Sequence, residues 1–182
     1  MRRTLLLAAL LIVGCDAQAP VPAPPAAAVA EAESARLNEW FDARFEEQLD
    51  FSPLTKTQLG RKDDYDKIDE LSESALDAQL EWRRRTVADL RRDFDREALT
   101  PEARTSYDLW IYALERAEAA QPFRRRSYVF HQMGGGHTGL PQALITLHRV
   151  DEEADMVAYV ARIAGVGRAV GQLLERARLA AD

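Results

Sequence analysis

The sequence predicts an all-α fold, a multi-helix amphipathic bundle, from two observations. Beyond residue 30, apolar side chains recur three or four residues apart through most of the chain, which is the period of a helix with one buried face. Residues that cap or end helices, such as Ser72, Thr100 and Gly60, stand between these runs. The helical domain is therefore expected to cover residues 31–182, which is long enough for one modest hydrophobic core.

The first predicted helix runs from Glu31 to Asp50 and is interrupted by the Ser-Pro pair at 52–53. One short helical turn from Leu54 to Leu59 is expected to end at Gly60. Residues 61–71 are charged and turn-like. The apolar stripe of the first helix consists of Leu37, Trp40, Phe41, Phe45 and Leu49.

Two longer helices are predicted in the middle of the chain. The first begins at Ser72 or Ser74, because either hydroxyl can cap a helix. The second begins at Thr100-Pro101-Glu102, which combines a capping hydroxyl, a proline at the first position and an early acid. Pro122 is expected to end it. The buried faces of these two helices carry Leu76, Leu80, Val87, Leu90 and Phe94, and then Tyr107, Trp110, Ile111 and Leu114.

Residues 123–140 differ in character, because their aromatic and branched side chains suggest an extended segment and the glycines at 134–136 force a loop. Leu140-Pro141 is expected to open a short helix. Asp151 can cap a further helix through Ile163, and glycines weaken a last helix from about Ala164 to Ala180. The apolar stripe of this last helix consists of Val166, Val170, Leu173, Leu174 and Ala177.

The amino terminus has the pattern of a secretory signal peptide. Two arginines precede an unbroken apolar run from Leu5 to Val13, which is too short for a permanent membrane span. Residues 12–15, Ile-Val-Gly-Cys, resemble the lipobox of bacterial lipoproteins, in which the cysteine thiol receives a diacylglyceryl group. We therefore expect residues 1–14 to be removed and Cys15 to be lipidated. An ordinary signal peptide that happens to carry a cysteine is the alternative.

The segment from Cys15 to Ala30 is predicted to be a lipid-anchored tether. It is rich in proline and alanine and has no hydrophobic period, so it favours an extended conformation. The expected location is therefore the cell envelope, where the chain is held at a membrane by lipid and faces the periplasm or the exterior. Asp16 follows the anchor, but the choice between inner and outer membrane stays open.

The charge balance argues against nucleic acid as a partner. The chain has 24 basic and 30 acidic residues, a net charge of −6 and a pI near 5.2. Loss of the two arginines of the signal peptide would take the net charge from −6 to −8. Such an acidic chain is a poor partner for a polyanion.

No catalytic group of residues stands out in the sequence. Zinc hydrolases often place two histidines at i and i+4 on a helix with a glutamate between them, and none of the three histidines here is followed by glutamate. A three-histidine site of His131, His137 and His148 is the one metal-binding alternative. The glycine loop can present backbone N–H groups to an anion. The candidate cleft loop consists of Gly134, Gly135, Gly136 and His137.

Several short motifs, taken in order, carry a family resemblance. The first are Ser-Pro-Leu-Thr-Lys-Thr-Gln-Leu-Gly at 52–60, Asp-Tyr-Asp-Lys at 64–67 and Leu-Ser at 71–72. They are followed by Tyr107-Asp108, Phe-His-Gln-Met-Gly at 130–134, His-Arg-Val at 148–150, Asp155, Ala158-Tyr159 and Arg162-Ile163. In this order and spacing they resemble the family called domain of unknown function 885, over roughly residues 35–178.

The resemblance implies a mostly helical, zinc metallopeptidase-like protein of the gluzincin type, with a deep cleft and a peptide substrate. Members are often bacterial lipoproteins or secreted proteins, in agreement with Cys15. The metal motif of the family, His-Glu-x-x-Pro-Gly-His-x-x-Gln, lies far downstream in a much longer chain, and nothing in this sequence matches it. No catalytic residue and no metal ligand can therefore be transferred, and zinc is implied only for full-length relatives.

Three functions stay open at this point. The chain is interpreted first as the amino-terminal fragment of such a hydrolase, an incomplete part of a larger helical fold that is inactive alone. The alternative is a free-standing helical lipoprotein that binds a peptide or protein partner without catalysis. The third is a small metalloenzyme that uses the three histidines. In the fragment interpretation, the apolar stripe of the last helix is expected to lack its packing partner.

Overall fold

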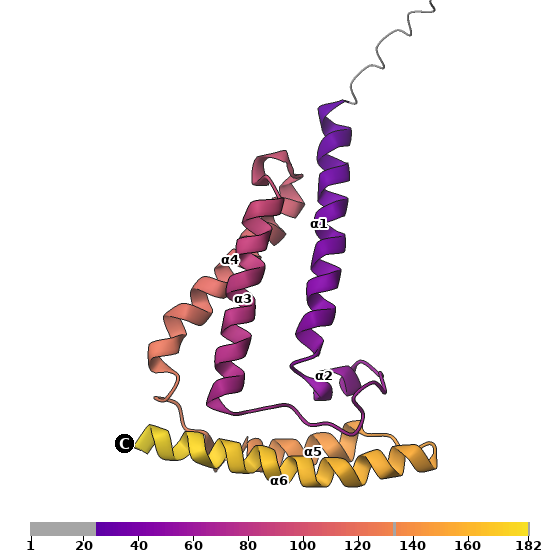
Figure 1. Ribbon diagram of the computed structural model, residues 1–182, viewed down its shortest axis with the longest axis vertical. Coiled ribbons are helices and arrows are strands. Elements are labelled where there is room, and N and C mark those ends of the chain that lie inside the picture. Colours follow the sequence, from indigo (N-terminus) through magenta and orange to yellow (C-terminus); the bar gives the residue numbers. More distant parts are fainter. Residues whose placement is uncertain (1–24, 133, 182) are drawn as a thin grey trace, which may run out of the picture.

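The described part of the chain, residues 25–132 and 134–181 of a computed structural model, is built almost entirely from helices (Figure 1). This confirms the predicted all-α fold class. The predicted signal peptide, Cys15 and the tether as far as residue 24 lie outside the described residues. Among the described residues, no helix combines the length and the apolar character needed to cross a membrane.

Three long helices form a bundle: α1 (Ala26–Leu49), α3 (Glu73–Asp93) and α4 (Pro101–Ala120). The hydroxyl of Ser72, rather than that of Ser74, caps α3 by accepting from the Ala75 N–H at 3.2 Å. A short 3-10 turn, η1 (Arg96–Ala98), connects α3 to α4. The buried bundle core comprises Leu37, Leu90, Phe94, Leu99, Ala103 and Tyr107, with Trp40, Phe41, Trp110 and Ile111 packed against it.

Two further helices, α5 (Gly136–Leu147) and α6 (Glu153–Ala181), lie side by side and cross the lower end of the bundle (Figure 1). We call this pair the base. The short helix α2 (Pro53–Gln58) lies between bundle and base, and the extended segment 66–71 runs along the base. The base has its own core of Ile68, Leu140, Ala169 and Leu173.

The connection from α4 to the base contains a 3-10 turn and a small hairpin. The turn is η2 (Gln121–Phe123), and the hairpin pairs β1 (Phe130–His131) with β2 (Gly134–Gly135) in antiparallel register. Residues near 130 are therefore extended, as predicted, whereas two of the three loop glycines belong to a short strand.

Three helix boundaries differ from those predicted. Helix α1 begins at Ala26, inside the expected tether, because a run of alanines extends the helix towards its amino end. Helix α5 begins at Gly136 rather than at Leu140, so Pro141 lies inside it. The two helices predicted after residue 151 are one continuous helix, α6, whose packing against the rest of the base outweighs the low helix propensity of its glycines.

Two further expectations about α6 are corrected. The side chain that accepts the N–H groups before α6 belongs to Asp155 rather than to Asp151, at 2.9 Å from Asp151 N and 3.1 Å from Glu152 N. The stripe expected to lack a partner is largely covered, because Leu173 is buried against Ile68 and Leu140, and Val166 and Val170 pack at the edge of that core.

Candidate functional site

Most of the motifs that carry the family resemblance meet where α2, the segment 61–71 and α6 come together, whereas Tyr107-Asp108 lies in the bundle and the motif at 130–134 in the hairpin. At the centre is Arg162, whose side chain has no exposed surface. Arg162 is the only charged residue of α6 between Asp155 and Arg168. An isolated charge within an apolar helix therefore marks this site in the sequence, although Arg162 was predicted only as part of a family motif and not as a site residue.

The guanidinium of Arg162 donates to uncharged acceptors from three segments of the chain. Its Nε donates to the Lys67 carbonyl at 2.9 Å, and its Nη2 donates to Thr57 Oγ1 at 2.7 Å. Its Nη1 lies 3.1 Å from His148 Nδ1. The carbonyls of Pro53 and Asp64 lie at 3.5 and 3.4 Å from Nη2. Burial lowers the pKa of this guanidinium, although arginine stays protonated at any physiological pH.

The imidazole of His148 is enclosed between aromatic rings and fixed at both nitrogens. It stacks on Tyr65 with ring centroids 4.0 Å apart and meets the edge of Tyr159 at 5.2 Å. Since Nδ1 faces a permanent donor on Arg162, the hydrogen-bond network assigns the ring proton to Nε2, which donates to the Asp155 carbonyl at 2.9 Å. The ring of His148 is therefore held in one orientation.

Tyr65 and Asp155 complete this group. The Tyr65 hydroxyl accepts from Arg149 N at 2.7 Å and donates to the Arg149 carbonyl at 3.0 Å. The Asp155 carboxylate accepts from Lys62 Nζ at 2.7 Å, and this bond, together with the backbone N–H groups of Asp151 and Glu152, lowers its pKa. We call Thr57, Tyr65, His148, Asp155 and Arg162 the polar clamp.

A second buried charge lies beside the clamp. Lys56 Nζ contacts three carboxylates, at 2.5 Å from Asp64, 2.9 Å from Asp50 and 3.3 Å from Asp63. The bond from Lys56, with a second from Lys67, lowers the pKa of Asp64 to about 2, and the same carboxylates raise the pKa of Lys56. The side chains of the polar clamp and of the Lys56 cluster form their hydrogen bonds and ion pairs with other groups of the protein. This geometry fits a structural joint rather than a substrate site.

In the candidate cleft loop, backbone conformation and packing explain two of the glycines. Gly135 has a φ of +135°, which side-chain-bearing residues rarely adopt. A Cβ on Gly136 would overlap Leu173 Cδ1, so any side chain at this position would force Leu173 to shift. His137 is exposed, and its ring packs edge-to-face on Phe130 with ring centroids 5.4 Å apart. Whether the loop lines a cleft stays a prediction.

The three histidines are not brought together as metal ligands. His131 and His137 are exposed near the hairpin, whereas both ring nitrogens of buried His148 have partners in the polar clamp. Within residues 25–132 and 134–181, no group of three or more His, Cys, Asp or Glu side chains is arranged to hold a metal ion. The described residues therefore do not fit the zinc that the family resemblance implies for longer relatives.

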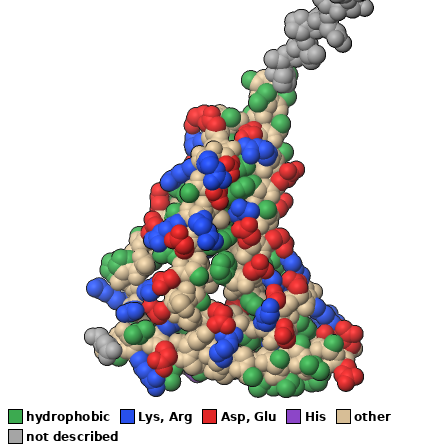
Figure 2. Space-filling view, viewed as in Figure 1, with side chains coloured by type: hydrophobic (Ala, Val, Ile, Leu, Met, Phe, Trp, Pro, Cys, Tyr) green, Lys and Arg blue, Asp and Glu red, His purple; other side chains and the backbone are tan. Residues whose placement is uncertain are grey.

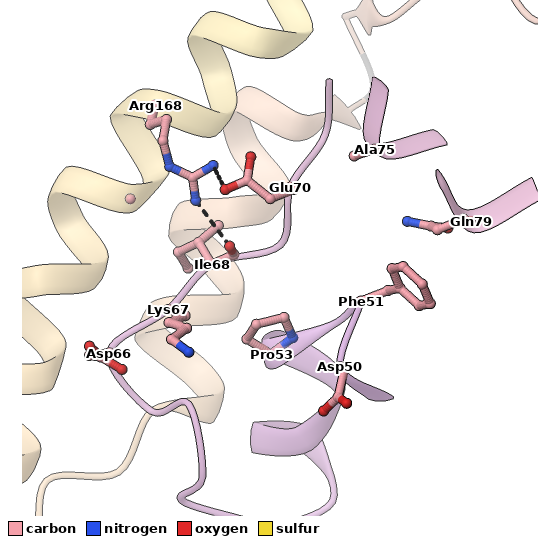
Figure 3. A pocket seen from close by; sticks show the side chains of 11 residues that line it. Asp50, Phe51, Pro53, Asp66, Lys67, Ile68, Glu70, Ala75, Gln79 and Arg168 are labelled. Atoms are coloured by element: carbon pink, nitrogen blue, oxygen red, sulfur yellow. Dashed lines mark hydrogen bonds and ion pairs between the residues drawn. The ribbon is translucent and has the colours of Figure 1, made fainter. Parts of the chain in front are cut away.

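Two adjoining pockets lie at the seam between bundle and base. Their volumes are about 340 and 270 Å³, and they share Phe51, Glu70 and Gln79 as lining residues. Figure 3 shows the larger one, where Arg168 bonds to Glu70 and to the Ile68 carbonyl. Most charged side chains on its rim are thus engaged in ion pairs, Arg168 with Glu70, Asp50 with Lys56 and Lys67 with Asp64.

The fold and the site define an all-α protein whose distinctive polar residues join two helical layers. The chain belongs to the family described as a bacterial protein of unknown function (DUF885), whose model matches residues 53–182. The predicted family is thereby confirmed, and the matched range begins at α2 and includes the whole polar clamp. No curated protein and no solved structure matches the chain.

Proposed function

We propose that this chain is the amino-terminal part of a membrane-anchored, zinc metallopeptidase-like hydrolase. In this proposal it supplies helical scaffold, while further helices of the same protein supply the metal motif and the peptide-cleaving site. The proposal derives from the family resemblance, and one structural observation carries it: the outer face of α6 is apolar and has no partner among the described residues.

The outer face of α6 is unusual for a helix on a surface. Apart from buried Arg162 and Arg168, which pairs with Glu70, the helix has no charge from Met156 to Leu174. Hydrophobic side chains gather along the lower edge of the molecule, where α6 lies (Figure 2). The exposed members are Met156 at 49%, Val157 at 66%, Val160 at 58%, Ile163 at 55% and Leu174 at 43%.

A helix that is apolar around its whole circumference is normally buried. Full burial of each large aliphatic side chain is favourable by roughly 1.5–3 kcal/mol of free energy. Several such side chains on one face therefore favour packing against another element. Ala164, Gly167 and Gly171 lie exposed between them and leave room for a close neighbour. A further helical layer of the same protein fits this face.

The proposed lipid anchor is compatible with this arrangement. Helix α1 begins at the end of the molecule opposite to the base (Figure 1). Its 24 residues span about 36 Å. An anchor at Cys15 would therefore hold the chain by its bundle end and leave the α6 face free for the rest of the hydrolase.

The decisive experiment places a charge on the proposed packing face. The full chain, in mild detergent, should bind a separately produced metal-motif segment of a full-length family member, and Val160→Glu should abolish that binding. Leu109→Glu on α4 is the matched control, because Leu109 is 60% exposed but lies in the bundle. Equal binding by the wild type and Val160→Glu, measured by calorimetry, would refute the proposal.

The alternative of a free-standing binding lipoprotein draws support from the two seam pockets. Their lining combines apolar Phe51 and Ile68 with the amide of Gln79, which lines both pockets. Under this alternative, peptide binding would depend on Gln79 and would be indifferent to Val160→Glu. The same calorimetric series therefore separates the two functions.

A further inference from the structure

A third pocket lies between the carboxyl half of α4 and the face of α3 that carries Leu76, Leu80 and Arg83. We call it the α3–α4 pocket. Its volume of about 360 Å³ is within the range of about 300–1,000 Å³ that is typical of ligand sites. Its lining is mainly apolar, and Phe123, which belongs to this lining, is 56% exposed. Exposed apolar surface that gathers around a hollow is typical of an interaction site.

Arg83 supplies the charge that this pocket offers to a ligand. Its side chain is half-buried and lines both the α3–α4 pocket and the smaller seam pocket. The nearby guanidinium groups of Arg84 and Arg124 are already paired with carboxylates of the protein. Within the described part of the chain, no carboxylate lines the α3–α4 pocket. Since arginine binds carboxylates through parallel N–H···O bonds, the pocket favours a carboxylate that is attached to an apolar group.

The α3–α4 pocket continues into the two seam pockets. Leu76, Gln79 and Arg83 line the smaller seam pocket as well, and Gln79 also lines the larger one, where Figure 3 shows it. A second amide, that of Gln48, lines the smaller seam pocket. Each amide side chain can both donate and accept hydrogen bonds, which is what a peptide backbone requires and an acyl chain does not use. The continuation of the groove therefore favours a peptide over a lipid.

We propose that the α3–α4 pocket binds the free carboxyl terminus of a partner polypeptide that ends in an apolar residue. The last side chain of the partner fills the pocket, its carboxylate pairs with Arg83, and the preceding residues lie along Gln79 towards the seam. This binding site involves α3 and α4 rather than the outer face of α6, so it does not depend on the hydrolase proposal.

The charges along the groove set the direction of the bound peptide. Asp69 and Glu70 line the smaller seam pocket, so an anionic group is disfavoured at that end and favoured at Arg83. Leu76 and Arg83 are seven residues apart on α3. This separation corresponds to about 10 Å along the helix, or to about three residues of an extended peptide. A short peptide is therefore a sufficient probe.

The test is a calorimetric titration of the full chain, in a fixed concentration of mild detergent. The probe is the peptide Ala-Gln-Ala-Gln-Ala-Phe, as the free acid and as the carboxyl-terminal amide. The free acid should bind, and amidation should weaken binding about ten- to a hundredfold, because it removes a charge-assisted pair. Arg83→Gln should weaken binding of the free acid equally and leave binding of the amide unchanged. Arg85→Gln is the matched control, because it removes the same charge from an exposed position on α3.

A second variant tests the apolar part of the pocket without changing its charge. Ala120→Trp fills the pocket from the end of α4 and should abolish binding of the free acid. Val160→Glu on α6 should leave this binding unchanged, so the outcome is separate from that of the hydrolase proposal. Equal affinity for free acid and amide, an equal loss in Arg83→Gln and Arg85→Gln, or no binding of the peptide would overturn the proposal. Binding of dodecanoate but not of the peptide would assign the pocket to acyl chains and overturn it as well.

Discussion

At the residue scale, Lys56 and Asp64 illustrate how a buried charge is stabilised in this protein. Lys56 is almost wholly buried, yet three carboxylates surround its ammonium group. Asp64 has a φ of +58°, a conformation that aspartate and asparagine tolerate better than most residues. At position 64, the carboxylate pairs with Lys56 and the backbone adopts the positive φ of the tight turn after α2.

Asp64→Asn should lower the stability at neutral pH by about 2 kcal/mol, because the pKa of the folded carboxyl is about 2 against an ordinary 3.8. A lowered folded pKa means that the contribution is complete above pH 3.8 and is lost as the pH falls towards 2. When urea unfolding is measured at a series of pH values, the free energy of unfolding of the variant should therefore decrease less between pH 4 and pH 2 than that of the wild type. Asp66→Asn, whose side chain is exposed, is the control; equal decreases in wild type and Asp64→Asn would contradict the assignment.

Cys15→Ser should leave the protein without lipid, because the lipobox reaction requires the thiol nucleophile. Metabolic labelling with a radioactive fatty acid checks this directly. We expect label on the wild type and none on the serine variant, with Ser52→Ala as a control that leaves the amino terminus intact. Label that persists on the Cys15→Ser protein would exclude the proposed anchor.

At the scale of the element, the start of α5 is fixed by the space in front of α6. Gly136→Ala should destabilise the protein by about 1–3 kcal/mol, since the added methyl overlaps Leu173 and the base core must shift. Gly139→Ala is a matched control in the same helix, because nothing lies within 4 Å of its Cβ position. That control should be stabilising by roughly 0.5–1 kcal/mol through helix propensity. Urea midpoints that move in the same direction for both variants would contradict this account of the packing.

At the scale of the whole molecule, two separate cores meet at a polar joint. The bundle core and the base core share no buried residue, and α2 with the segment 66–71 lies between them. Hydrophobic packing alone does not specify how two such layers are oriented. The directional bonds of the polar clamp supply that orientation, which is a reason for most of the family motifs to gather there.

The full chain, purified in mild detergent, is expected to hold no stoichiometric zinc and to hydrolyse no peptide. The physical reason is that the described residues bring no three metal ligands together. Elemental analysis and a fluorogenic peptide assay measure the two properties. One tightly bound zinc per chain that disappears in His137→Ala would overturn the expectation and revive the three-histidine alternative.

The sequence by itself determined the local features of the fold. Helical periodicity and capping residues predicted α3 and α4 closely, because Ser72 and Thr100 satisfy N–H groups within their own helices. The family was also recognised from the order of short motifs, since that order depends on the chain alone.

Only the tertiary structure decided how distant segments meet. The burial of Arg162 depends on partners about 100 residues away, and the place of Gly136 depends on Leu173 across the base. The same reason explains why α6 continues through its glycines and why Asp155 replaces Asp151 as its cap. Local spacing predicts which face of a helix is apolar, but the element that covers it is set by contacts between segments far apart in the sequence.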